Sequence, residues 1–150
     1  MIIGHLAISI LESHYLDTDI RPTVAGGLFP DVLDKSLCQV LNVSRHGRLW
    51  GHTVLGLVLS TVIVGATGGR RAGRDWALGY VSHLLADLEG PIPILYPYAT
   101  YTLPDSPPIS ETLHRFVTDP RKLLPELALA IWAAGVLIRA RRGKRRATEN

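Results

Sequence analysis

A run of 21 residues without Lys, Arg, Asp or Glu, from position 49 to position 69, constrains the fold of this 150-residue chain more than any other feature. A helix of about 20 apolar residues is long enough to cross the hydrocarbon core of a bilayer. Glycines within the run would let neighbouring helices pack closely in lipid. A fully buried helix of a compact all-α protein would have the same composition. Of these two interpretations, we favour the membrane-spanning one.

Apolar residues recur at helical spacing in other parts of the chain as well. The pattern predicts a first helix over residues 2–15 and further helices over residues 76–88, 110–117 and 123–138. Ser110 is the expected N-terminal cap of the helix at residues 110–117. No alternation with a period of two supports a sheet. We therefore predict an all-α fold, a compact bundle of about four to five helices with some of them embedded in a membrane.

Glycine and proline mark the expected breaks between these helices. Pro22 is expected to end any continuation of the first helix, and residues 26–31 to form a compact turn or the start of a helix. Three arginines predict a basic loop at residues 70–74, and five prolines predict an extended loop at residues 92–108.

The positive charge of the chain is concentrated at its C-terminal end. Residues 139–150 carry six basic residues and one acidic residue, whereas the first 138 residues hold ten basic and twelve acidic ones. We therefore predict a single domain over residues 1–138, followed by a basic flexible tail at 139–150, and no specific nucleic-acid binding. The positive-inside rule places such a tail on the cytosolic side of a prokaryotic inner or plasma membrane.

Two pairs of polar residues stand in otherwise apolar helical surroundings. His83 and Asp87 are four residues apart, which places both on one face of a helix. A metal would stabilise such a buried pair, and so would a hydrogen bond between its two members. Asp31 and Asp34 are also about one helical turn apart. They could be two ligands of a divalent cation, or ordinary carboxylates at the start of a helix.

His5 and His52 carry the same ambiguity when each is considered alone. Together with the two pairs they form a mixed set of imidazoles and carboxylates, the ligand chemistry of Zn²⁺, Mn²⁺ or Fe²⁺ in hydrolases. The single cysteine, Cys38, excludes an internal disulfide and a CxxC zinc site.

Four stretches of the chain resemble a known family when they are taken in order. They are GLFPDVLDK at 27–35, GRLWGHT at 47–53, GYVSHLLAD at 79–87 and LYP at 95–97. They resemble the membrane-bound metal-dependent hydrolases, a family that includes the LexA-regulated inner-membrane proteins and is distantly similar to zinc-dependent phospholipase C. The resemblance implies a phospholipase C-like all-α fold. It also implies one set of metal ligands, namely His5, Asp31, His52, His83 and Asp87, with Asp34 as a further ligand or a supporting carboxylate.

The chain departs from the family pattern in ways that limit the number of metal ions. Lys35 stands where many members have a histidine, and His114 is the only histidine after Asp87. We therefore expect one or two ions, zinc first and manganese or iron as alternatives, and not a trinuclear site.

The expected function is that of a membrane-associated metal-dependent hydrolase of phosphoesters. Its substrate would be a membrane lipid or another phosphoester, attacked by a water that the metal activates between His52, His83 and the aspartates. Asp31 or Asp34 would accept the proton, so that Asp31, Asp34 and His52 are the candidate catalytic residues. Arg48 is a candidate for steadying a phosphate, although such an arginine is more often solvated. The alternatives are a non-catalytic small integral membrane protein and a metal-storage or metal-sensing module.

Overall fold

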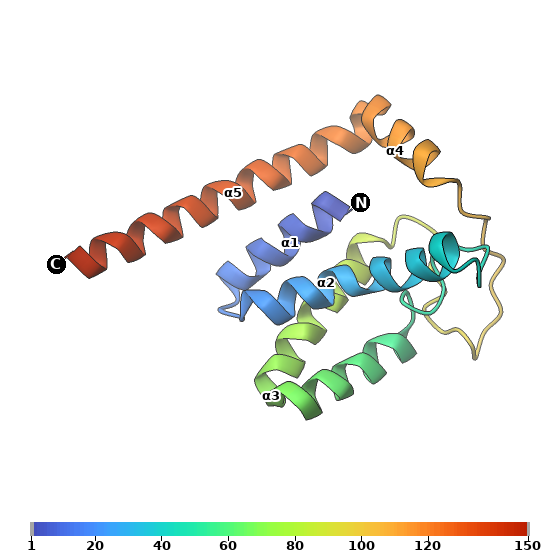
Figure 1. Cartoon of the computed structure of the whole chain (residues 1–150), viewed down its shortest axis with the longest axis horizontal. Coiled ribbons are helices and arrows are strands. Elements are labelled where there is room, and N and C mark those ends of the chain that lie inside the picture. The colour runs from blue at the N-terminus through green and yellow to red at the C-terminus, as the bar shows by residue number, and fades with distance from the viewer. Residues whose placement is uncertain (1, 150) are drawn as a thin grey trace.

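The computed structural model describes the backbone of residues 2–149 and the side chains of residues 3–108 and 110–142. The helices are α1 (Ile2–Tyr15), α2 (Ile20–Lys35), the π-helical turn η1 (Ser36–Val40), α3 (Val54–Ala86), α4 (Ile109–Thr118) and α5 (Pro120–Glu149), as Figure 1 shows. No strand occurs between residues 2 and 149. The predicted all-α bundle is confirmed.

The first two helices show where the sequence patterns succeed and where they fail. α1 has the bounds that its apolar periodicity predicts. α2 begins earlier than predicted, because the Asp19 carboxylate caps it by accepting a hydrogen bond from the Arg21 N–H at 3.0 Å. Pro22 lies in the first turn, where a backbone N–H has no partner within the helix, so it does not end the helical region. The predicted turn at residues 26–31 is wrong, since α2 continues through it.

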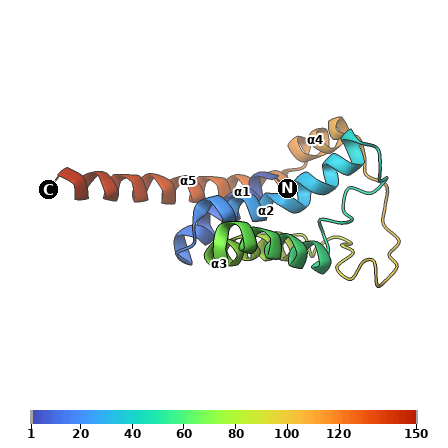
Figure 2. The ribbon, with the colours of Figure 1, turned by 60° about the horizontal axis from the view of Figure 1, so that its bottom comes forward.

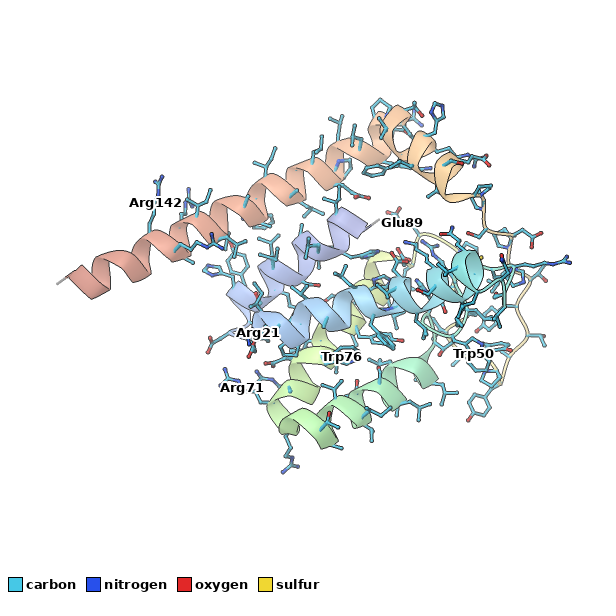
Figure 3. All side chains as sticks on the ribbon, viewed as in Figure 1. Arg21, Trp50, Arg71, Trp76, Glu89 and Arg142 are labelled. Atoms are coloured by element: carbon cyan, nitrogen blue, oxygen red, sulfur yellow. The ribbon has the colours of Figure 1, made fainter. Side chains whose placement is uncertain are left out.

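Two glycine contacts bring α2 and α3 close together. A Cβ atom on Gly26 would lie 2.2 Å from the carbonyl oxygen of Trp76, and one on Gly79 would lie 2.0 Å from the carbonyl oxygen of Thr23. Trp76, labelled in Figure 3, also packs its ring against Phe29 of α2, with 5.2 Å between the ring centroids. These glycines are therefore contact residues between helices and not turn residues.

α3 consists of two helical limbs that meet at Gly69. This residue has φ 87° and ψ 164°, a conformation that is available to glycine and strained for other residues. The limbs run back along each other (Figure 1), and the indole N–H of Trp76 donates a hydrogen bond to Ser60 Oγ at 3.0 Å. The predicted basic loop at residues 70–74 is wrong, because the second limb begins directly after Gly69.

The chain after α3 differs from the sequence expectations in two details. Residues 87–108 form neither helix nor strand, as the prolines predict. α4 follows Pro108 without a side-chain capping bond, so Ser110 is inside the helix and is not its cap. α5 contains the predicted apolar stretch at 123–138 and continues to Glu149, so the basic residues from position 139 onward belong to a helix.

α5 packs lengthwise along α1 and extends beyond the bundle at its C-terminal end (Figures 1 and 2). Ala7 and Leu11 of α1 form a small apolar core with Ala133 and Val136 of α5. The buried carboxylate of Glu126 accepts a hydrogen bond from the Gly4 N–H at 3.3 Å. This bond occupies one of the N–H groups that the start of a helix leaves free.

Exposed apolar side chains cover the first limb of α3 and much of α5. Val62 and Ile63 are 63% and 62% exposed, and Ile131 is 72% exposed. By length and composition alone, α3 and the part of α5 from Pro120 to Arg142 are each apolar enough to cross a membrane, although α3 reverses direction at Gly69, and none of the apolar window of α3 is buried. The alternative of a fully buried helix at residues 49–69 therefore does not fit the structure.

The glycine contact between α2 and α3 predicts a clear difference between two glycine-to-alanine variants. Gly79→Ala places a methyl group against the Thr23 carbonyl and is expected to destabilise the fold by about 1–3 kcal/mol. Gly135→Ala in α5 meets nothing within 4 Å and is expected to be neutral or to stabilise by up to about 1 kcal/mol through helix propensity. Thermal unfolding in detergent measures both, and equal midpoints for the two variants would contradict the close contact.

Candidate metal centre

The structure brings the five predicted ligands together from four parts of the chain. They are His5 of α1, Asp31 of α2, His52 in the segment before α3, His83 of the second limb of α3, and Asp87 at the C-cap of that limb. Each is at most 4% exposed. Their donor atoms form two overlapping groups, His5–His83–Asp87 and Asp31–His52–His83, and within each group the atoms lie within 4.8 Å of one another.

Hydrogen bonds on the outer side of two histidines fix the state of their inner nitrogens. His83 Nδ1 lies 2.7 Å from the carbonyl oxygen of Gly27, and a carbonyl only accepts, so Nδ1 carries the proton. His52 Nδ1 lies 2.7 Å from the Asp34 carboxylate and donates to it in the same way. When both rings are neutral, both Nε2 atoms are left with a lone pair. Burial acts to lower the pKa of His52, but its hydrogen bonds to Asp34 and Asp87 outweigh it and raise the pKa, and a protonated His52 ring would direct its Nε2–H toward Asp87 Oδ2 at 3.3 Å. The two Nε2 atoms face each other at 3.2 Å.

Two facing lone pairs at this distance cannot form a hydrogen bond with each other. The buried atoms around them are also incompletely satisfied. His5 Nδ1 has no hydrogen-bond partner, and His5 Nε2 and Asp87 Oδ1 lie 3.3 Å apart without the geometry of a hydrogen bond. Unpaired polar atoms in a protein interior are costly. A cation between these groups would engage the facing nitrogens of His52 and His83, one nitrogen of His5 and the carboxylate of Asp87, so the donor set fits a metal ion of the kind that imidazole and carboxylate prefer.

Asp87 lies between two of the histidines and an arginine. Its Oδ1 atom is 3.3 Å from His5 Nε2, and its Oδ2 atom is 3.3 Å from His52 Nε2 and 2.9 Å from Arg48 Nη2. Burial alone would raise the pKa of this carboxyl, but the two histidines and the Arg48 charge lower it well below its usual value. Asp87 is therefore ionised, as a metal ligand must be.

Asp31 has a similar arrangement with a lysine one turn later in α2. Lys35 Nζ lies 2.5 Å from Asp31 Oδ2, while Asp31 Oδ1 lies 4.0 Å from His52 Nε2. Burial acts to raise the pKa of the Asp31 carboxyl, and the charge and hydrogen bond of Lys35 outweigh it, so the pKa is lowered. One oxygen of Asp31 thus faces the lysine and the other faces the histidines.

Asp34 lies behind His52 and not among the groups that face one another. Its Oδ1 atom accepts a hydrogen bond from the Gly51 N–H at 2.8 Å, and its Oδ2 atom accepts from the Leu49 N–H at 2.6 Å and from His52 Nδ1. Both oxygens are thereby engaged with N–H donors. The geometry makes Asp34 a carboxylate that orients His52, and the proton-acceptor role expected of Asp31 or Asp34 stays a prediction.

The remaining histidines lie outside the centre. His14 and His114 are exposed, and His46 Nδ1 lies 3.2 Å from the Pro104 carbonyl. Two contacts were not found from the sequence. The Asp31–Lys35 spacing of four residues could have indicated the ion pair, whereas the Gly27 carbonyl is a backbone atom and has no signature in the sequence.

Comparison with known proteins gives a family for the chain. The family model of the YdjM inner membrane protein matches residues 1–145. No curated protein and no solved structure matches the chain. The match confirms the membrane-protein part of the resemblance noted in the sequence, whereas the hydrolase and phospholipase C parts stay predictions. The chain belongs to the YdjM inner membrane protein family.

Proposed function

We propose that this membrane protein binds one or two divalent cations in the candidate metal centre and hydrolyses phosphoesters there. The observation that carries the proposal is the pair of His52 and His83 Nε2 atoms, which point their lone pairs at each other at 3.2 Å. Each ring is held in that tautomer by a partner on its far side, the arrangement that usually supports metal-binding histidines.

Zinc is the preferred ion because three imidazoles and two carboxylates provide the donors. His83 belongs to both donor groups, which is compatible with either one or two ions. A divalent cation supplies Lewis acidity and lowers the pKa of a bound water toward neutrality. The new oxygen on phosphorus would come from water, and Asp31, whose Oδ1 atom lies 4.0 Å from His52 Nε2, would accept the water's proton and return it to the leaving alcohol.

One observation favours the non-catalytic alternative, in which the polar cluster only joins helices. Lys35 and Arg48 each contact one of the two carboxylates, so Asp31 and Asp87 have partners without a metal. That alternative leaves both ring nitrogens of His5 without a hydrogen-bond partner. It accounts for the facing nitrogens of His52 and His83 only when the His52 ring is protonated. Metal content separates the two.

The metal content of the purified protein is the first test. Wild-type protein, prepared without a histidine tag, is expected to hold near-stoichiometric zinc or manganese by elemental analysis. The double variant His83→Ala, Asp87→Ala removes two donors and is expected to lose the metal, whereas His114→Ala removes an exposed histidine and is expected to keep it. Folded wild-type protein that stays empty after zinc or manganese is added would overturn the proposal.

Hydrolysis is tested with an activated diester, bis(p-nitrophenyl) phosphate. The metal-loaded wild type is expected to release nitrophenolate, and the double variant and chelator-treated wild type are expected to stay at the rate of the buffer. Loaded wild-type protein that hydrolyses no phosphomonoester or phosphodiester probe would instead indicate a metal-storage or metal-sensing module.

Because Asp34 orients His52, substituting it is expected to lower the affinity for metal even though Asp34 itself does not face the candidate metal site. Asp34→Asn weakens the hold on His52 Nδ1 and is expected to lower zinc affinity by roughly 10–100-fold. Asp105→Asn, at a carboxylate that is 73% exposed, is the matched control and is expected to change nothing. Competition with a zinc-binding dye measures both, and equal affinities would remove Asp34 from the centre.

A further inference from the structure

A cavity of about 250 Å³ adjoins the candidate metal centre. Its lining includes Lys35, Gln39, Arg48, Pro104, Ser106 and Thr112. Lys35 and Arg48 are the two residues that also contact carboxylates of the centre. The cavity and the centre therefore share a wall that is made of two cations.

Each of these cations faces the centre on one side and the cavity on the other. Lys35 Nζ contacts Asp31, Arg48 Nη2 contacts Asp87, and their side chains are 32% and 35% exposed. Gly90 leaves room for the guanidinium group, since a Cβ atom there would lie 2.4 Å from Arg48 Nη1. Of the two remaining charged or titratable residues that line the cavity, Asp105 is 73% exposed and lies 3.9 Å from His46 Nδ1.

The charges of this wall change when a metal ion binds. Without metal, the carboxylates of Asp31 and Asp87 each pair with one of these two cations. A divalent ion would compete with Lys35 and Arg48 for these carboxylates, and it would add two positive charges beside the cavity. A phosphate monoester carries close to two negative charges at neutral pH, and a guanidinium group matches the geometry of phosphate oxygens.

We propose that this cavity binds the phosphate group of the substrate through Lys35 and Arg48, and that it does so when a cation occupies the centre. The proposal rests on the proposed function, because the cation supplies the charge that the anion balances. Binding of the cation and binding of the phosphate group are then coupled, so each ligand raises the affinity of the protein for the other ligand. Lys35 and Arg48 would thus determine specificity for phosphate.

The test measures two affinities of the full-length protein in neutral detergent. The probes are zinc alone and, with zinc at saturation, methylphosphonate, an oxyanion without an ester bond to hydrolyse. Arg48→Gln is expected to weaken methylphosphonate binding by roughly tenfold or more, the usual effect of losing a charged hydrogen bond. Its zinc affinity is expected to be unchanged or higher, because a competitor for Asp87 Oδ2 is gone.

The opposite directions of these two effects separate the proposal from general damage to the fold. A misfolded variant would lose both affinities, and in that case Lys35→Gln, which acts on the other carboxylate, provides the same test. Arg45→Gln is the matched control. Arg45 is an exposed arginine on the same segment as Arg48; it lines a neighbouring cavity, and it makes no ion pair within residues 3–108. It is expected to leave methylphosphonate affinity within about twofold of wild type.

Lipid competition identifies the source of the phosphate. Phosphatidic acid and a fatty acid are added separately to the detergent micelles. Displacement of methylphosphonate by phosphatidic acid alone supports the proposal with a lipid headgroup as substrate, and displacement by neither supports it with a soluble phosphoester. Equal displacement by both would show that the cavity recognises negative charge, and would overturn the assignment to phosphate.

The two proposals fail in distinguishable ways. Wild-type protein that binds no zinc overturns the proposed function. Wild-type protein that binds zinc and binds methylphosphonate no better than the Arg48→Gln and Lys35→Gln variants overturns the cavity proposal alone.

Discussion

The Gly27 carbonyl reaches the ring of His83 because no side chain separates α2 from the second limb of α3. Gly26 and Gly79 allow the two backbones to come this close, and the 2.7 Å hydrogen bond to His83 follows from it. That bond turns the Nε2 lone pair of His83 toward His52. If α2 and α3 crossed at a slightly greater distance, this hydrogen bond would be lost and the tautomer of His83 would no longer be fixed. The same candidate ligands would then be present but not oriented toward one another.

The helices that follow from apolar periodicity could be predicted from the sequence, whereas those that depend on backbone contacts between helices could not. α1 follows from its pattern alone. α2 was hidden by glycines and prolines, which usually mark breaks, because their role as contact residues appears only once α3 is beside them. The basic loop predicted at residues 70–74 was wrong, because a turn made by one glycine cannot be told from a loop of several residues by composition.

The ligand set of the centre was predictable in kind, because imidazoles and carboxylates in apolar helices need partners. Two details were not predictable, namely which of its two expected roles Asp34 takes and where Arg48 lies. The role of Asp34 depends on two backbone N–H groups near Gly51, and the position of Arg48 depends on the close approach of Gly90. The ion pair of Lys35 with Asp31 was within reach of the spacing rule for helices. Sequence thus indicates which donors a site can have, whereas their orientation comes from atoms that the whole fold brings together.

The reversal at Gly69 has a topological consequence for the membrane. Residues 54–68 rise about 22 Å as a helix, less than the roughly 30 Å of a hydrocarbon core. Since the second limb returns beside the first, a bilayer would hold α3 as a re-entrant pair, with both open ends at one surface. His52 and His83 lie at those ends, so in this arrangement the candidate centre would lie at one surface of the bilayer, and its candidate ligands would not have to come from opposite sides of the membrane.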